Sequence, residues 1–222
     1  MKVDVKGTIV SDNDGWIYDW FGIQVTYPKK INKALEDAKG AAIEVEINSG
    51  GGDVFAGSEI YTALRNYKGS VNIRIVGMAA SAASVIAMAG KCEMSPTAQM
   101  MVHNVSSYAD GDTHDMAHMA EVLENANKAI AAAYVGKTGM SENDALEMMD
   151  KETWLTAEQA LEKGLIDKIM FSDNTQPLLA ASYGSGLLPK SVIDRTREYL
   201  TNSKTEKAKA EYEFLNMKEI LK

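Results

Sequence analysis

A run of small residues lies near the middle of the chain and reads Gly77-Met78-Ala79-Ala80-Ser81-Ala82-Ala83-Ser84. A strand-like segment, 71–76, precedes this run, and the apolar helical pattern of 85–89 follows it. A hydroxyl at a strand-to-helix turn has free backbone N–H groups and the positive end of a helix dipole beside it. A nucleophile and the oxyanion it generates need such surroundings. Ser81 is therefore a candidate nucleophile, and tight helix packing is the alternative explanation.

Strand and helix patterns alternate along the chain on both sides of this turn. Strands are predicted over 3–10, 42–47, 71–76, 100–103 and 165–170, and helices over 29–39, 54–67, 112–135 and from 141 and 156. The segment 12–15, Asp-Asn-Asp-Gly, indicates a turn. Repeated strand–helix units predict an α/β fold with a mostly parallel sheet and right-handed crossovers. We expect one domain over 1–171, followed by a linker and a charged, partly helical C-terminal tail over 172–222.

Composition excludes several classes of protein. The 222 residues are 45% hydrophobic and 24% charged, which is ordinary for a globular domain. A net charge of −8 argues against a nucleic-acid surface. A single cysteine, Cys92, excludes an internal disulfide and a cysteine-rich metal site. No apolar run is long enough for a membrane helix, and the N-terminus lacks a signal-peptide core, so a cytoplasmic location is expected.

A glycine run, Asn48-Ser49-Gly50-Gly51-Gly52, stands between a predicted strand and a predicted helix. Consecutive glycines allow positive φ angles and close approach, so their N–H groups can face an anionic oxygen. A phosphate-binding loop is the rival interpretation. The Lys-Ser/Thr pair of such a loop is missing, however, and Asp53 would repel phosphate.

The remaining chemistry-bearing residues are histidines and acids. His103 ends an apolar strand, whereas His114 and His118 lie one helical turn apart and lack a third metal ligand, so a solvated helix face is the favoured explanation. Asp150 and Glu152 form an acidic pair just before a tryptophan that we expect to be buried. Taken alone, the two acids are best explained as solvated residues at a helix end.

Together these motifs resemble the proteolytic subunit of Clp protease. The resemblance covers about residues 43–170 in the family's order, and its motifs are Ile47-Asn48-Ser49-Gly50-Gly51-Gly52, Gly77-Met78-Ala79-Ala80-Ser81, Met101-Val102-His103, Trp154-Leu155-Thr156-Ala157-Glu158-Gln159-Ala160 and Gly164-Leu165-Ile166-Asp167. The resemblance implies the fold shared by Clp proteases and crotonases. The N-terminal region and the charged tail are similar to phage or prophage members, which resemble head maturation proteases.

The resemblance also implies a role for each site residue. Ser81 matches the nucleophile, His103 the general base and Glu152 the third member of the triad, where the family commonly has aspartate; Asp150 is the fallback. The oxyanion donors match the backbone N–H groups of Gly52 and Ala82. A second departure is Gly50, where the family usually has proline. No cofactor and no metal are implied.

The implied activity is that of a serine endopeptidase acting on peptides or unfolded proteins, and the apolar surroundings of Ser81 favour an apolar P1 side chain. A homo-oligomeric ring of six or seven subunits, stacked face to face, is implied, with an ATPase unfoldase or capsid proteins as partners. The long helix supports this because it carries surplus apolar positions. Its inward positions are predicted to be Met116, Met119, Ala120, Leu123 and Ala126. The alternatives are a crotonase-like acyl-CoA enzyme and a non-catalytic capsid or assembly component.

Overall fold

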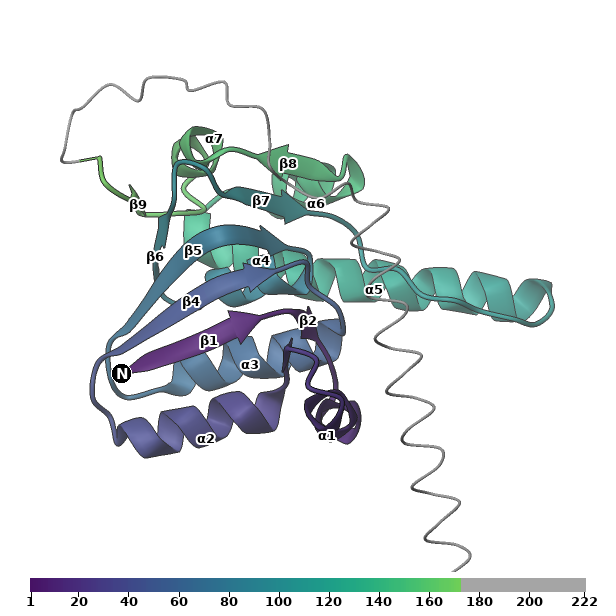
Figure 1. Cartoon of the computed structure of the whole chain (residues 1–222). Coiled ribbons are helices and arrows are strands. Elements are labelled where there is room, and N and C mark those ends of the chain that lie inside the picture. The colour runs from purple at the N-terminus through teal and green to yellow at the C-terminus, as the bar shows by residue number, and fades with distance from the viewer. Residues whose placement is uncertain (173–222) are drawn as a thin grey trace, which may run out of the picture. The chain divides into compact units, whose positions relative to one another are not determined.

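Parallel strands form the centre of the protein (Figure 1). The structure is a computed structural model and describes residues 1–172. The first half contains β1 (Lys2–Lys6), β2 (Thr8–Ile9), α1 (Asp12–Trp20), β3 (Val25–Thr26), α2 (Pro28–Ala38), β4 (Ile43–Ser49), α3 (Val54–Asn66) and β5 (Val71–Ala80). The second half contains α4 (Ala82–Ala87), β6 (Lys91–Met94), β7 (Gln99–Val102), α5 (Thr113–Thr138), α6 (Glu142–Asp150), β8 (Thr153–Leu155), α7 (Ala157–Glu162) and β9 (Lys168–Ile169).

The main sheet has the strand order β1-β4-β5-β6-β9, and all of these neighbours pair in parallel. The long strand β5 pairs with β6 along its first half and with β7 along its second half, and β8 adds to β7 antiparallel. Strands β2 and β3 form a separate parallel pair. The predicted α/β fold with a mostly parallel sheet is confirmed.

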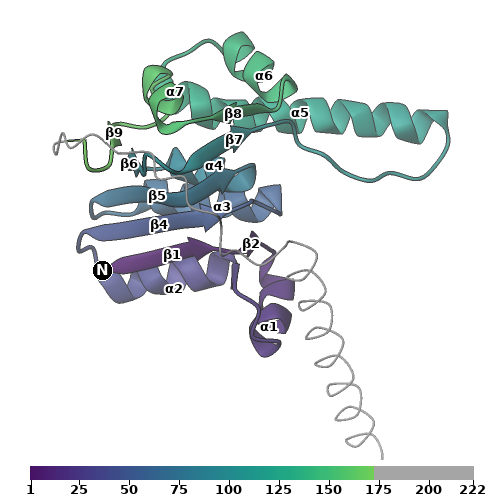
Figure 2. The same cartoon turned by 45° about the horizontal axis from the view of Figure 1, so that its top comes forward.

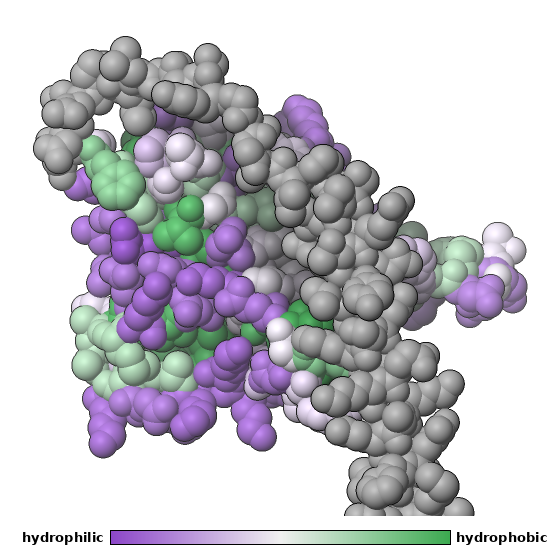
Figure 3. All heavy atoms as spheres, in the orientation of Figure 1, coloured by the Kyte–Doolittle hydropathy of each residue, from purple (hydrophilic) through white to green (hydrophobic). Residues whose placement is uncertain are grey.

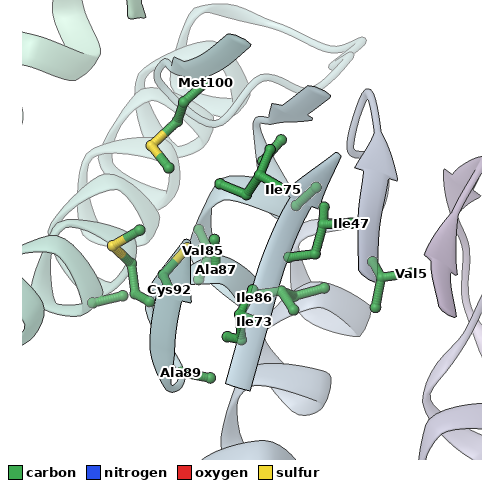
Figure 4. Close-up of a cluster of buried hydrophobic side chains, with 14 of the residues drawn as sticks. Val5, Ile47, Ile73, Ile75, Val85, Ile86, Ala87, Ala89, Cys92 and Met100 are labelled. Atoms are coloured by element: carbon green, nitrogen blue, oxygen red, sulfur yellow. The ribbon is translucent and has the colours of Figure 1, made fainter. Parts of the chain in front are cut away.

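Apolar side chains from the strands meet α4 in the core (Figure 4). Ile73 and Ile75 of β5 are completely buried, and Ile86 of α4 packs with them. Every residue of α4 is buried. Its small side chains permit close packing, because a Cβ added to Gly57 of α3 would lie 2.9 Å from the Ala82 Cβ.

The opposite face of the sheet is charged, so the strands alternate between apolar and charged residues. Glu46 of β4 forms ion pairs with Lys2 at 2.7 Å and with Lys6 at 3.2 Å. Arg74 of β5 forms an ion pair with Glu44 at 3.1 Å. Figure 3 shows hydrophilic residues gathered over the strands on this face. The sheet therefore has one core face and one polar face.

Helix α5 extends beyond the rest of the described residues in both views (Figures 1 and 2). Its buried residues, Ile130, Ala131, Ala133 and Tyr134, all lie in its C-terminal half. The predicted inward positions Met116, Met119, Ala120, Leu123 and Ala126 are exposed or half-buried, so this prediction is wrong. The segment between β7 and α5 runs out to the N-terminal end of the helix (Figures 1 and 2), yet it leaves these positions exposed or half-buried.

Three further comparisons with the sequence predictions concern single segments. The turn predicted at 12–15 is wrong, because those residues begin α1. Asp12 accepts the Lys29 N–H at 2.8 Å, and a Cβ added to the buried Gly15 would lie 2.4 Å from the Tyr27 ring, so contacts with residues 27–29 fix this helix.

Trp154, expected to be buried, is 47% exposed. The predicted tail over 172–222 lies almost wholly outside the described residues. Over residues 1–172, no helix combines the length and the apolarity needed to cross a membrane.

Candidate active site

Ser81 occupies the junction between β5 and α4 in a strained backbone conformation. Its φ of 55° and ψ of −128° lie outside the regions that non-glycine residues prefer, at a cost of about 1–3 kcal/mol. The Ser81 N–H donates to the Met101 carbonyl of β7 at 2.9 Å, which anchors the turn. Strain of this kind persists where surrounding structure enforces it, and it is frequent at functional sites.

His103 follows β7 directly and contacts Ser81. The His103 Nε2 and the Ser81 Oγ lie 2.8 Å apart, which is hydrogen-bonding distance. Pairing of β5 with β7, in which Ala80 lies opposite Met101, brings the two ends together. The two residues that sequence reasoning selected from separate motifs are therefore in contact.

Neither Ser84 nor the single cysteine, Cys92 of β6, offers an alternative nucleophile. Ser84 is fully buried, and its hydroxyl is engaged by the Ser81 carbonyl at 2.6 Å and the Tyr134 hydroxyl at 2.8 Å. Burial raises the pKa of the Cys92 thiol to about 12, so a reactive thiolate is not formed at neutral pH. Ser81 differs from both, because its hydroxyl lies at hydrogen-bonding distance from His103.

The glycine run packs directly against the Ser81 turn. A Cβ added to Gly51 would lie 2.6 Å from the Ala80 carbonyl oxygen and 2.7 Å from the Ser81 Cβ. Gly51 and Gly52 have φ angles of 88° and 147°, which glycine adopts without strain. Gly50 differs from both, because its φ is not positive and a Cβ there would make an ordinary 3.6 Å contact with Met78.

Strand β2 holds the glycine run on both sides of Gly52. The Ile9 N–H donates to the Gly51 carbonyl, and the Asp53 N–H donates to the Ile9 carbonyl, each at 2.9 Å. A buried hydroxyl adds a further link, since Ser49 donates to the Gly7 carbonyl at 2.6 Å and accepts the Gly51 N–H at 3.1 Å. We call this set of contacts the Ile9 clamp.

Sequence reasoning missed the Ile9 clamp, although one signal for it was present. Ser49 takes the place of an apolar residue in the period-two pattern of Ile43, Val45 and Ile47, which indicates a buried hydroxyl with a structural partner. The partner, Gly7, is 42 residues away, and no local pattern identifies it.

A cavity of about 460 Å³ joins these groups. Gly52, Ser81, Ala82 and His103 all line it. Within residues 1–172, neither the Gly52 N–H nor the Ala82 N–H has a hydrogen-bond acceptor, so both donors are available to a bound oxygen. The other lining residues include apolar side chains, namely Val54, Phe55, Val85, Met101, Val105 and Ile130.

The acids lie near His103 but do not contact it. The Asp150 Oδ1 accepts the Asn104 Nδ2 at 2.7 Å, and the Glu152 Oε1 accepts the Trp154 Nε1 at 3.3 Å. In the described part of the chain no hydrogen bond joins either acid to His103. The Asn104 Oδ1 is buried and has no hydrogen-bond partner there.

The metal interpretation of the helix histidines gains no support. His114 and His118 both lie on the exposed N-terminal half of α5. Across residues 1–172 there is no cluster of three or more histidine, cysteine or acidic side chains that could hold a metal ion.

Comparison with known proteins identifies the family. The family model described as Clp protease matches residues 31–173, which is more than half of the chain. The chain belongs to the Clp protease family. The predicted family and the enzyme class, a serine-type peptidase, are confirmed by this match and by the relatives named below.

Several Clp protease subunits are similar in sequence. The chain is 37% identical over 148 residues to the ATP-dependent Clp protease proteolytic subunit 1 of Streptomyces avermitilis, a match covering 65% of this chain and 68% of the relative. It is 32% identical over 134 residues to the ATP-dependent Clp protease proteolytic subunit of Bacteroides fragilis, covering 59% and 65%. The corresponding protein of Deinococcus radiodurans is 33% identical over 131 residues, covering 58% and 64%. The matches therefore span about two thirds of the length of these Clp proteins.

The segment that matches the Clp protease family contains the proposed site residues but not Ile9. Gly52, Ser81, Ala82, His103 and Glu152 all fall within residues 31–173, whereas the Ile9 half of the clamp lies outside that range. This member of the Clp protease family therefore supports its glycine run with a segment that the family model does not cover.

Proposed function

We propose that this chain is a serine endopeptidase in which Ser81 is the nucleophile, His103 the general base and Glu152 the acid that orients the imidazole. The 2.8 Å contact between His103 Nε2 and Ser81 Oγ carries the proposal. A base within hydrogen-bonding reach of a serine hydroxyl is the geometric requirement for activating it.

The reaction is acyl transfer in two halves. His103 Nε2 takes the Ser81 proton while the Ser81 Oγ bonds to the carbonyl carbon of the scissile peptide, and the N–H groups of Gly52 and Ala82 receive the oxyanion. The imidazolium then gives its proton to the leaving amine as the C–N bond breaks. Water, deprotonated by His103, hydrolyses the acyl-enzyme and restores the Ser81 hydroxyl.

Strand register supports Glu152 over Asp150 as the acid. In the antiparallel pair of β7 and β8, the last pair is Val102 with Thr153, so His103 and Glu152 both adjoin the end of this ladder, where Glu152 has a φ of 46°. Asp150 already accepts a hydrogen bond from Asn104. In the triad, the Glu152 carboxylate would accept the His103 imidazole N–H in place of the Trp154 indole N–H, and its side chain is one methylene longer than that of aspartate.

The substrate is a peptide or unfolded protein segment with an apolar P1 side chain. The apolar lining of the cavity, formed by residues such as Val85, Met101 and Ile130, favours such a side chain. The relatives are named ATP-dependent, which favours an ATPase partner over a role in capsid maturation for this chain as well.

The exposed half of α5 supports assembly into a ring. Met116 and Val122 are 39% and 43% exposed there, and apolar residues on a projecting helix favour contact with another subunit. Closed cyclic symmetry buries such surfaces on every copy, and stacking of two rings would bury the helix ends.

Labelling with a serine-directed fluorophosphonate, read by intact mass, tests the nucleophile. We expect a single adduct on the wild-type chain, mapped to Ser81, and none on Ser81→Ala. An adduct on another serine would contradict Ser81 as the nucleophile, and turnover of acyl-CoA thioesters without labelling would favour the acyl-CoA alternative. An unlabelled and inactive assembled protein would favour the non-catalytic one.

A further inference from the structure

Two buried hydroxyls connect α5 to the nucleophile turn. The Tyr134 hydroxyl lies 2.8 Å from the Ser84 Oγ, and the Ser84 hydroxyl donates to the Ser81 carbonyl at 2.6 Å. Ser84 has one hydroxyl proton, which goes to the Ser81 carbonyl, so the Tyr134 O–H must donate to the Ser84 Oγ. The chain of hydrogen bonds therefore runs in one direction, from α5 to the Ser81 carbonyl.

Both hydroxyls are fully enclosed, with exposed fractions of 1% for Tyr134 and 0% for Ser84. Every residue of α4 is buried, and Ile130 and Ala131 lie one turn before Tyr134 on α5, where Tyr134 also borders the cavity that contains Ser81 and His103. Burial raises the pKa of Tyr134 to about 12, so the phenol stays protonated and remains a donor at working pH. Polar groups enclosed in this way are stable only when paired, which makes each hydroxyl dependent on the other.

The acceptor of this chain belongs to the peptide unit that carries a proposed oxyanion donor. The Ser81 carbonyl and the Ala82 N–H are parts of one planar group and point in opposite directions. The Ser84 N–H also donates to this carbonyl, at 2.9 Å, and the Ser84 hydroxyl adds a shorter hydrogen bond from the same residue. A carbonyl fixed toward Ser84 in this way directs the Ala82 N–H toward the cavity, where it has no acceptor among residues 1–172. Hydrogen bonding at the carbonyl also polarises the peptide unit and strengthens its N–H as a donor.

We propose that Tyr134 and Ser84 are positioning residues that hold the Ser81–Ala82 peptide unit in the orientation required for oxyanion binding. The proposal rests on the proposed peptidase function, because it assigns these residues a role in that reaction. Neither side chain touches the reacting atoms; Tyr134 acts through Ser84, and Ser84 acts through the backbone.

The test compares three variants of the full chain with the wild type on a short fluorogenic peptide with an apolar P1 residue. Tyr134→Phe removes one hydroxyl, Ser84→Ala removes the side-chain hydrogen bond to the Ser81 carbonyl and keeps the one from the Ser84 N–H, and the double variant removes both hydroxyls and leaves neither of them unpaired. Rates are expressed per active site, titrated with the fluorophosphonate, so that partial misfolding does not lower them. Tyr67→Phe is the matched control, because it removes a tyrosine hydroxyl that bonds the remote Ala41 carbonyl at 2.7 Å.

We expect Ser84→Ala and the double variant to lower kcat per site by about tenfold, part of the roughly 10²–10³-fold cost of losing an oxyanion donor, while KM changes less than about twofold. A peptide aldehyde, whose hemiacetal oxygen occupies the oxyanion site, should bind these variants correspondingly more weakly. Tyr134→Phe should show a smaller loss of the same kind, and Tyr67→Phe none.

Wild-type kcat per site and unchanged aldehyde affinity in the double variant would overturn the positioning role while leaving the peptidase intact. An equal loss in Tyr67→Phe would also overturn it, since the effect would then be general destabilisation. Absence of peptidase activity and of Ser81 labelling in the wild type would instead overturn the proposed function, and the positioning role with it.

Discussion

At the scale of single residues, the proposed chemistry depends on one contact, between Ser81 and His103. A serine hydroxyl is a weak nucleophile unless a base removes its proton, so neither residue is useful without the other. The strained backbone of Ser81 presents the hydroxyl at the end of the sheet, and β7 supplies the base from the neighbouring strand.

We predict that Ser81→Ala and His103→Ala each reduce peptide hydrolysis by about 10⁴–10⁶ in kcat, and that the double variant is scarcely worse. Members of a catalytic unit act together, so their losses do not multiply. Initial rates on a fluorogenic peptide measure this. Ser81→Ala turnover within tenfold of the wild type would exclude Ser81 as the nucleophile.

The acid can be assigned by a pair of isosteric substitutions. Glu152→Gln should lower kcat by about 10²–10⁴, because the charge that stabilises the imidazolium is lost while the volume is kept. Asp150→Asn is the matched control and should be mild, because its partner is Asn104. The reverse order of effects would show that the acid was assigned to the wrong residue.

Residue-level prediction from sequence relied on local signals. Ser81 stood in a small-residue turn and His103 at a strand end, and both features were visible in a few neighbouring residues. The relation of Tyr134 to Ser84 was not, because the two are 50 residues apart and their pairing depends on how α5 crosses α4. Trp154 was expected inside on hydrophobicity alone, yet its indole donates to Glu152 at the surface.

At the scale of elements, the glycine run is held by a strand as well as by its own turn. The Ile9 clamp binds the residues on either side of Gly52, whose own N–H has no acceptor among residues 1–172. The sequence predicted a single strand over 3–10, whereas Gly7, with a φ of 73°, divides it into β1 and β2. That division lets β1 join the main sheet while β2 reaches the site.

Gly52→Ala should lower kcat by about 100-fold or more, because a Cβ there would lie 2.1 Å from the Ile9 carbonyl oxygen and would displace an oxyanion donor. Gly50→Ala is the matched control, since its Cβ would meet only Met78 at 3.6 Å and no positive φ is required. Steady-state rates, with thermal melting to verify folding, measure both. Equal activity of the two variants would show that the Gly52 N–H does not bind the oxyanion.

An ion pair between elements predicts a pH dependence of stability. Burial raises the pKa of the Asp167 carboxyl, but hydrogen bonds from Lys137 of α5 and from the Cys92 N–H of β6 outweigh it, so the pKa lies below its ordinary value of 3.8. A lowered pKa contributes stability that is present above the unfolded pKa and is lost as pH falls through the folded pKa.

The urea midpoint of the wild type should therefore fall as pH is lowered from about 5 toward and below 3.8, and Asp167→Asn should show a shallower fall over the same interval. At neutral pH the variant should be the less stable of the two. Parallel curves for the two proteins would mean that Asp167 contributes nothing to the acid sensitivity.

At the scale of the whole molecule, helix α5 has a buried C-terminal half and a projecting N-terminal half. The buried half carries Tyr134 and packs beneath the nucleophile turn, whereas the projecting half carries exposed Met116 and Val122. The apolar spacing of the helix was readable from sequence. The sequence did not show which neighbouring element covers each half of the helix, because that depends on where the sheet ends.

Sedimentation velocity at micromolar concentration should give a species of six or more subunits for the wild type. Val122→Glu should shift it toward smaller species, because a charge on the projecting face opposes its burial against another subunit. Lys29→Glu, a charge change on the exposed surface of α2, is the control and should leave the species unchanged. Sedimentation of the wild type as a single chain would contradict ring assembly, even if Ser81 proved reactive.

The pairing of β1 with β4 bears on what could be removed from this protein. Five residues of β1 align with β4 from Lys2–Glu44 to Lys6–Asn48, although the family match begins only at residue 31. A chain trimmed to the matched segment would leave a row of unpaired N–H and carbonyl groups along β4, and such an edge recruits strands from other molecules. The boundary set by evolutionary similarity thus falls inside the unit that folds, and a fragment cut there would aggregate with a loosened glycine run.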